Sequence, residues 1–102
     1  MSQVYLDVHE DADRELEDAA DYYDRESTGL GSALINEVEA AYSRIRRTPL
    51  AAVEVDPGIR RLVLAKFPYN VIYEVDEDSA LVLAIAHQRK RPYYWRGRGQ
   101  AR

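Results

Sequence analysis

The sequence predicts an α+β fold in which an N-terminal strand precedes an antiparallel helix hairpin, and the hairpin packs on a mainly antiparallel sheet of three to four strands. Three observations predict this fold. The chain opens with alternating apolar and polar residues, two long segments follow with apolar residues at helical spacing, and the second half holds three apolar runs separated by turn residues. The length of 102 residues fits a single domain, which we place at residues 1–96, with a flexible basic tail at residues 97–102.

The first half is expected to form one strand and two helices. Residues 4–8 alternate as a strand with one buried face does. From Asp11 the spacing becomes helical, and Gly29 is a natural residue to end this helix. A second helix should run from about residue 30 to residue 47, before Pro49, and the short link predicts a hairpin. The two apolar stripes are Ala12, Leu16, Ala19, Ala20 and Tyr23, and then Leu34, Val38, Ala41, Tyr42 and Ile45.

The second half is expected to form an antiparallel meander. The strand candidates are residues 59–67, which Pro68 ends, residues 70–75, and residues 80–86. The last run is almost wholly apolar, which is typical of a central strand covered on both faces. The helix hairpin then has only this sheet against which to bury its stripes.

Composition excludes several classes of protein. With no cysteine, the chain has neither a disulfide framework nor a thiolate metal site. No apolar run reaches the roughly 18 residues that a membrane span needs, so we expect a soluble, intracellular protein with no membrane partner. No ligand cluster or phosphate loop indicates a metal or another cofactor.

Charge is distributed very unevenly along the chain. The net charge is −4, yet the residues from His87 to the end include six basic and no acidic side chains. An acidic front and a basic end predict two surfaces that meet different partners. The overall acidity argues against indiscriminate binding of nucleic acid, and we expect the acidic face of the first helix to be simply solvated.

Arg60 and Arg61 are adjacent in a predicted strand, so their side chains should leave opposite faces of the sheet. One would turn toward the helices and pair with an acid. The other would face outward, either solvated or holding a phosphate or a carboxylate in its bidentate fork. The sequence leaves open which arginine takes which place, because a one-residue change in register reverses them.

His87 is the candidate for general acid–base chemistry, since its ordinary pKa lies near neutrality. RNA cleavage by a 2′-hydroxyl needs a base, an acid and a cation. His87 has the chemistry for such a set together with Tyr93 or Tyr94 and with Arg60, Arg61 or Arg89. The alternative is a strand-end histidine bonded to the backbone. Alternation along the last strand predicts one shared face for Leu81, Leu83, Ile85, His87 and Arg89.

The segment from residue 88 to residue 98 interleaves cations with aromatic residues. It contains Arg89, Lys90, Arg91, Arg96 and Arg98 together with Tyr93, Tyr94 and Trp95. This mixture suits phosphate contact with base stacking, and it suits an acidic peptide equally well. A third interpretation is structural: the aromatic residues fold back to cap the core while the charges stay solvated.

Several strings in this order resemble the RelE/ParE superfamily of toxins from bacterial type II toxin–antitoxin systems. They are Asp21-Tyr22-Tyr23, Ile59-Arg60-Arg61-Leu62, residues 66–73 (KFPYNVIY), residues 84–89 (AIAHQR) and Pro92-Tyr93-Tyr94-Trp95. The resemblance covers residues 4–98. It implies a cytoplasmic toxin with no cofactor, which inhibits growth, contributes to plasmid stabilization and is held inactive in a hetero-oligomer with its antitoxin. It also implies a groove between the helix hairpin and the sheet that an antitoxin segment occupies.

The resemblance leaves the target open. ParE-like members inhibit DNA gyrase, whereas RelE-like members are endoribonucleases that cut mRNA in the ribosome. The strand that ends in His-x-Arg favours the ParE branch, and the chain lacks a lysine-rich cluster because its only lysines are Lys66 and Lys90. A non-toxic interaction module is a third possibility.

Two sets of site residues follow from these readings. The binding candidates are Arg60, Arg61, Lys66, Tyr73, His87, Arg89, Arg91, Tyr93 and Trp95. If the protein is a ribonuclease, the catalytic candidates are His87, Arg60, Arg61, Arg89 and Tyr94.

Overall fold

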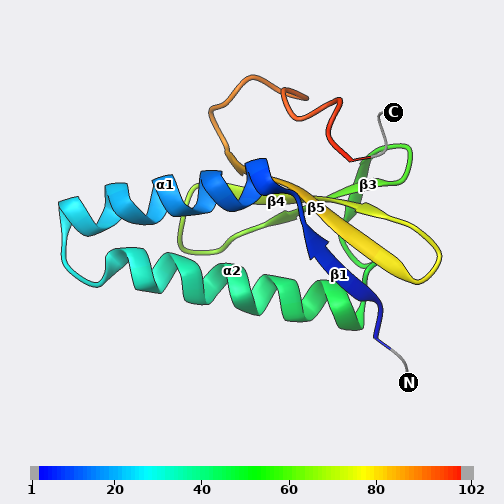
Figure 1. Ribbon diagram of the computed structural model, residues 1–102, viewed down its shortest axis with the longest axis horizontal. Helices are drawn as coiled ribbons and strands as arrows, with labels where there is room; N and C mark the ends of the chain where they lie inside the picture. The colour runs from blue at the N-terminus through cyan, green and yellow to red at the C-terminus, as the bar shows by residue number, and fades with distance from the viewer. Residues whose placement is uncertain (1–2, 100–102) are drawn as a thin grey trace.

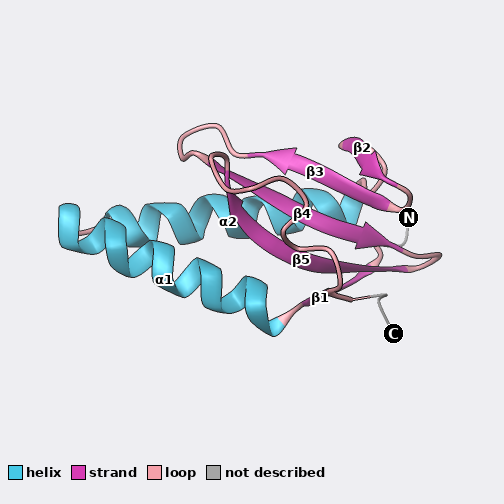
Figure 2. Ribbon diagram, turned by 90° about the horizontal axis from the view of Figure 1, so that it is seen from above, coloured by secondary structure: helices cyan, strands magenta, loops and turns pink. Residues whose placement is uncertain are grey.

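The computed structural model describes residues 3–99, and within them the chain forms two helices and five strands (Figure 1). Their order is β1 (Tyr5–Val8), α1 (Glu10–Glu26), α2 (Leu30–Arg47), β2 (Val53–Asp56), β3 (Ile59–Val63), β4 (Tyr69–Val75) and β5 (Ser79–His87). The two helices lie side by side on one face of the sheet, as Figure 2 shows from above. The predicted α+β fold is confirmed, with one strand more than expected.

Local sequence explains where the helices begin. His9 caps α1, because its Nδ1 accepts a hydrogen bond from the Asp11 N–H at 3.0 Å, and acidic residues fill the first turn. Gly29 leads into α2 with φ +93°, a conformation that glycine adopts without a steric penalty. The predicted helix bounds are confirmed within a residue or two. Both predicted stripes are buried, except that Tyr23 is only half-buried.

The sheet has the strand order β1-β5-β4-β3-β2. Strands β3, β4 and β5 form the predicted antiparallel meander, and β1 pairs in parallel with β5. The sequence analysis missed β2, a four-residue edge strand whose alternating valines and acids bury little. It also extended β3 too far: the strand ends at Val63, and the Leu64 N–H then donates to Tyr69 O at 3.0 Å across the turn into β4.

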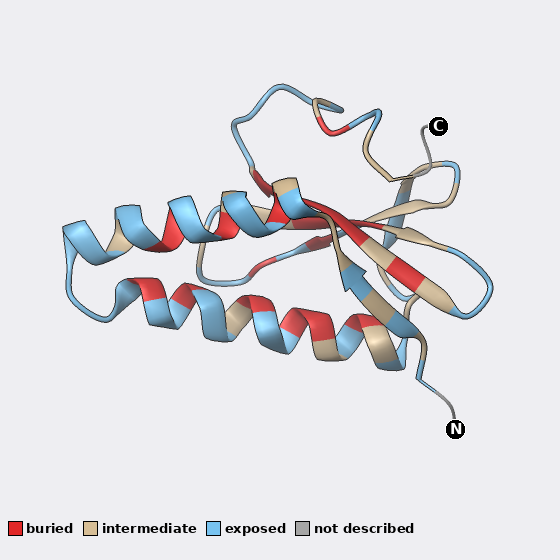
Figure 3. Ribbon diagram, in the orientation of Figure 1, coloured by how far each residue is buried: buried red, intermediate tan, exposed pale blue. Residues whose placement is uncertain are grey.

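Two apolar clusters lie on opposite faces of the sheet. The larger one joins both helix stripes to Val71, Tyr73, Val82 and Ile85. The smaller one, on the face away from the helices (hereafter the open face), contains Ile72, Leu83, Ala84, Ala86 and Trp95. Strand β5 contributes to both clusters and is red along most of its length in Figure 3. The predicted central strand, covered on both faces, is confirmed.

A β-bulge in β5 changes which residues share a face. Ile72 pairs with Ala84 and Tyr73 pairs with Val82, so Leu83 is an extra residue between two successive pairs. As a result, Leu83 packs in the open-face cluster while Ile85 packs in the helix-side cluster. The predicted single face for Leu81, Leu83, Ile85 and His87 is therefore wrong, since strict alternation does not survive an inserted residue.

After β5 the chain crosses back over the open face (Figure 1). Residues 93–98 make two tight turns, in which Arg96 N–H bonds Tyr93 O at 3.0 Å and Arg98 N–H bonds Trp95 O at 3.2 Å. The tail expected at residues 97–102 begins, in its described part, as a packed segment, because the Arg98 side chain is only 18% exposed. Residues 100–102 lie outside the described part of the chain. Neither described helix is long and apolar enough to cross a bilayer.

Candidate functional site

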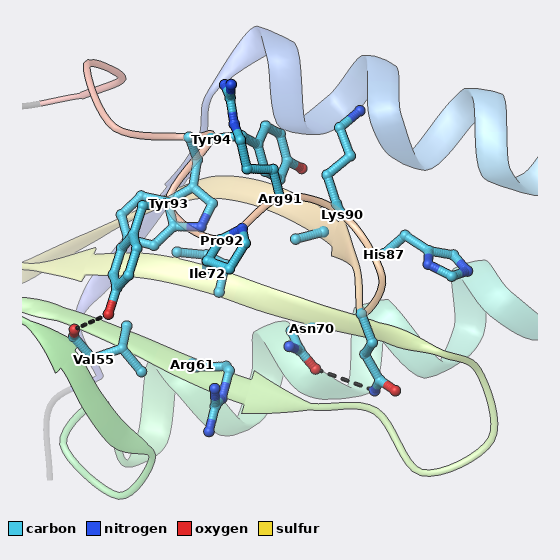
Figure 4. Close-up of a pocket in the computed structure, with 13 residues that line it drawn as sticks. Val55, Arg61, Asn70, Ile72, His87, Lys90, Arg91, Pro92, Tyr93 and Tyr94 are labelled. Carbon is cyan, nitrogen blue, oxygen red and sulfur yellow. Dashed lines mark hydrogen bonds between the residues drawn. The ribbon is translucent and has the colours of Figure 1, made fainter.

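A pocket of about 190 Å³ lies between the open face of the sheet and the segment that follows β5 (Figure 4). Strands β2, β3 and β4 contribute Val55, Arg61, Asn70 and Ile72, and the end of β5 contributes Ala86 and His87. The opposite wall is formed by Gln88, Lys90, Arg91, Pro92, Tyr93, Tyr94 and Trp95. Most of the basic and aromatic residues singled out by the sequence therefore do meet at one place.

The two adjacent arginines of β3 do leave opposite faces of the sheet. Arg61 is exposed and lines the pocket. Arg60 faces the other way, where its guanidinium donates to the carbonyl oxygens of Leu50 at 3.0 Å and Ala52 at 2.7 Å. Its partners are backbone carbonyls rather than the acid that the sequence led us to expect. The structure thus places Arg61 at the pocket and gives Arg60 a role in holding the chain before β2.

His87 lies at the margin of the pocket, and its ring points away from the pocket in Figure 4. Its Nδ1 accepts a hydrogen bond from the Arg89 N–H at 3.1 Å, and the ring packs edge-on against Tyr69 with centroids 5.0 Å apart. The residue also lines a second hollow between α1 and β5. This is the strand-end, backbone-bonded histidine that formed the structural alternative.

Tyr93 and Trp95 form much of the outer wall. Tyr93 adopts φ +62°, and the guanidinium of Arg96 lies 4.1 Å from the centre of its ring. Arg96 also pairs with Asp56 at 3.2 Å, which joins the segment to the end of β2. Trp95 is only 4% exposed and packs on the open face. The structural interpretation of this segment, in which aromatics cap the core, fits Trp95.

Glu15 on α1 holds this segment in place, and the sequence analysis missed it. One carboxylate oxygen accepts from the Ile85 N–H at 3.0 Å and the other from the Tyr94 hydroxyl at 2.8 Å. Arg98 donates to both oxygens at 3.2 and 3.1 Å and also to Leu83 O at 2.8 Å. Burial raises the pKa of the Tyr94 phenol, and the hydrogen bond to Glu15 raises it further.

No local signal distinguishes Glu15 from the other acids of α1. Its partners come from residues 70 to 83 positions away along the chain, so only the folded structure brings them together. The expectation that the acidic face of α1 is simply solvated is therefore wrong at this position, where the side chain is 23% exposed.

Three other site candidates lie away from the pocket. Tyr73 is 1% exposed in the helix-side core, where its hydroxyl donates to Pro49 O at 2.7 Å. Lys66 lies in the β3–β4 turn, whose backbone N–H groups bind the Glu37 carboxylate. Arg89 is exposed and does not line the pocket. None of the three lines the pocket with Arg61.

The charge around the pocket is of one sign. Among the described residues that line it, Arg61, Lys90 and Arg91 are basic and none is acidic. The amides of Asn70 and Gln88 add polar groups and are joined to each other at 3.3 Å (Figure 4). The sheet side of the pocket includes the apolar residues Ile72 and Ala86, and Trp95 adds an apolar surface to the wall. Apolar surfaces with a positive rim suit an anionic ligand that also carries apolar groups. Within residues 3–99, no three His, Cys, Asp or Glu side chains gather as a metal site would require.

The comparisons with known proteins agree with this fold. None of the curated proteins matches the sequence. A solved structure titled "Chromosomal ParDE TA system from P. aeruginosa" has a similar fold, with a TM-score of 0.62 and 16% sequence identity over 83% of this chain and 96% of that chain. Residues 6–92 match the family described as the ParE toxin of the type II toxin–antitoxin system parDE. This chain therefore belongs to the ParE toxin family of the RelE/ParE superfamily.

Proposed function

We propose that this toxin acts by binding rather than by cutting RNA, with DNA gyrase as its target. Family membership on the ParE side supports gyrase as the target. The observation that carries the proposal is that the groups a ribonuclease would need do not converge. Arg60 lies on the opposite face from Arg61, and the His87 ring points away from the pocket.

Tyr94, one of the two tyrosines proposed as the acid, is also engaged elsewhere. The Tyr94 hydroxyl donates a hydrogen bond to Glu15, and burial together with that carboxylate raises the pKa of the phenol. A phenol in this environment is a poor general acid or base near neutral pH, because its pKa is far from the working pH. A binding surface needs no such group.

Supercoiling of relaxed plasmid by purified gyrase tests the target. We expect the toxin to inhibit supercoiling, and we expect the His87→Ala variant to inhibit it equally, since no proton transfer is involved. Unimpaired supercoiling at a toxin concentration that arrests growth would show that gyrase is not the target.

A second candidate function is RNA cleavage, which the positive rim of Arg61, Lys90 and Arg91 favours. Primer extension on transcripts from induced cells distinguishes it. Discrete cleavage sites that disappear in the His87→Ala variant would establish the ribonuclease, and their absence supports the binding mechanism. No effect of induction on growth would instead indicate a non-toxic interaction module.

The antitoxin is the second partner that we propose. The P. aeruginosa structure with the similar fold is titled as a ParDE system, and this chain shares that family. We expect the product of the neighbouring gene to bind this chain as a hetero-oligomer and to neutralise it, through a segment that folds as it binds. Co-expression followed by affinity purification tests this, and a toxin recovered free of that product would contradict it.

A further inference from the structure

The C-terminal segment from Tyr93 to Gly99 lies beyond the family match, which ends at residue 92, and it crosses the open face of the sheet (orange to red in Figure 1). The backbone hydrogen bonds of residues 93–98 stay inside this segment, where Arg96 N–H bonds Tyr93 O and Arg98 N–H bonds Trp95 O. Residues 93–98 are therefore attached to the strands and helices through side chains.

We propose that residues 93–99 form a strap that opens and closes as one unit over the open face, and that Glu15 is the latch that holds the strap closed. The inference goes beyond the proposed function, because it concerns how the wall of the pocket is held and does not depend on what the toxin binds. The contacts of Glu15, the backbone at the start of the strap and the membership of the two apolar clusters support it.

Glu15 and Arg98 take the place of a missing strand at the edge of β5. Strand β1 ends at its pair with Val82, so the residues of β5 beyond that pair have no strand on this side. There the Glu15 carboxylate accepts the Ile85 N–H at 3.0 Å, and the Arg98 guanidinium donates to Leu83 O at 2.8 Å. The two side chains also bind each other, at 3.2 and 3.1 Å. The closed strap thus completes an edge that the sheet leaves open.

The contact between Glu15 and Arg98 is partly sheltered from water. Their side chains are 23% and 18% exposed, and the Tyr94 hydroxyl donates a further hydrogen bond to the same carboxylate at 2.8 Å. Elsewhere in the strap, Arg96 pairs with Asp56 at 3.2 Å, but the Arg96 side chain is 58% exposed. An exposed ion pair contributes little to stability, whereas sheltered charge-assisted hydrogen bonds contribute more. Among the polar contacts of the strap, closure therefore depends mainly on Glu15.

The backbone at the start of the strap opposes closure. Tyr93 holds φ +62°, a left-handed conformation that a residue with a Cβ adopts at a cost. Such strain persists only where surrounding contacts hold it in place. Opening of the strap relieves this strain, so the side-chain contacts of the closed strap work against its backbone.

The larger core of the molecule does not include the strap. None of residues 93–99, all of which the structure describes, belongs to the helix-side cluster, and Trp95 belongs to the smaller cluster on the open face. Opening would therefore uncover Ile72 and Leu83 while the helices keep their packing against the sheet. Segments that share few contacts with the core open at a lower free energy than the whole protein unfolds.

Trp95 makes the strap visible in solution. It is the only tryptophan of the chain and is 4% exposed, so its fluorescence reports closure, whereas far-ultraviolet circular dichroism reports the helices. In a urea titration of the unchanged protein, we expect the Trp95 emission to shift to longer wavelength at a lower urea concentration than the dichroism signal falls. A protein that unfolds in one step shows both transitions at the same concentration, and this result would overturn the proposal.

Two matched variants test the latch. Glu15→Gln keeps the shape of the side chain and removes the charge that binds Arg98. It should lower the fluorescence midpoint by about 1 M urea or more and leave the dichroism midpoint within about 0.3 M, because the strap is already open when the helices unfold. A merely structural role of Glu15 would lower both midpoints together. Glu17→Gln makes the same change at an exposed residue of α1 and should move neither midpoint.

Arg98→Gln removes the other half of the latch and should lower the fluorescence midpoint as Glu15→Gln does. The double variant should add little to either single change, because the two side chains act through one contact. Dichroism spectra without urea check that each variant folds.

Three results would overturn the assignment of Glu15 as the latch. They are an equal lowering of both midpoints by Glu15→Gln, an effect of Glu17→Gln as large as that of Glu15→Gln, and full additivity of the two latch variants. Because no partner is present in these measurements, they leave the proposed target and the antitoxin to their own tests.

Discussion

At the scale of single residues, two buried tyrosines of the helix-side core differ in the hydrogen bonding of their hydroxyl groups. Tyr42 and Tyr73 are 5% and 1% exposed. The Tyr73 hydroxyl donates to Pro49 O at 2.7 Å, whereas the Tyr42 hydroxyl has no hydrogen-bond partner among the described residues. A buried polar atom without a partner carries a desolvation penalty that a bonded one recovers.

Replacing each of these tyrosines with phenylalanine should therefore affect the free energy of unfolding differently. Tyr73→Phe should lower the free energy of unfolding by about 0.5–1.5 kcal/mol, because a net favourable hydrogen bond is lost. Tyr42→Phe should leave it unchanged or raise it, because it removes an unsatisfied hydroxyl and keeps the ring. Urea titrations of the three proteins, followed by circular dichroism, measure both differences. Equal losses in the two variants would show that the Tyr42 hydroxyl is satisfied in solution.

The sequence predicted the types of residue at the candidate site better than their roles. It indicated that basic and aromatic groups would gather around the end of the last strand, and Arg61, His87, Tyr93 and Trp95 all line one pocket. It could not predict the place of Glu15, because every partner of this carboxylate outside α1 is distant in sequence.

At the scale of elements, the helix hairpin depends on one close contact. Gly31 lies in the first turn of α2, where a Cβ would come against the carbonyl oxygen of Ala20 on α1 and within 2.7 Å of the Asp24 carboxylate. The same carboxylate accepts a hydrogen bond from the Gly31 N–H at 2.8 Å. Asp24 thus caps α2 from the neighbouring helix, and only a residue without a side chain allows this approach.

Gly31→Ala should destabilise the protein by about 1–3 kcal/mol, because the added methyl group forces the two helices apart. The matched change Ser32→Ala, at the next residue of the same helix, is exposed and should change the free energy of unfolding by less than about 0.5 kcal/mol. Thermal unfolding of both variants compares them. If Gly31→Ala were as stable as Ser32→Ala, the close contact between the helices would not be essential to the hairpin.

Elements with a strong periodic signal were predicted well. Both helices, β4 and β5 lie where their apolar patterns placed them. Edge strand β2 was missed because its four residues contribute little to the core, and half of them are acidic. The bulge at Leu83 was missed because β5 is apolar on both faces, so its sequence does not show which residue is unpaired.

At the scale of the whole molecule, folding buries the phenol groups of several tyrosines at least in part. Burial raises the pKa of Tyr42 and Tyr94, and it raises the pKa of Tyr23, Tyr69 and Tyr73 as well. The unfolded chain keeps pKa values near the ordinary 10.0, so it ionises first as the pH rises. Ionisation of the unfolded chain then favours unfolding.

The free energy of unfolding should accordingly be unaffected by ionisation of these phenols below about pH 9. It should fall progressively above about pH 10. The sign follows from the raised pKa values, since the unfolded state releases protons that the folded state still holds. Urea midpoints measured between about pH 8 and pH 11 test this. The Tyr42→Phe variant should lose less stability in that range than the unchanged protein. A midpoint that stays constant to about pH 11 would contradict the prediction.

The sequence by itself determined the α+β class, the helix hairpin, the antiparallel meander and the positive charge at the end of the chain, because periodicity and charge are properties of neighbouring residues. Only the tertiary structure decided that Arg61 rather than Arg60 lies at the pocket, that His87 turns away from it, and that Glu15 holds the segment that forms its wall. The physical reason is that strand register, the inserted residue in β5 and contacts between distant segments are set by how surfaces pack together.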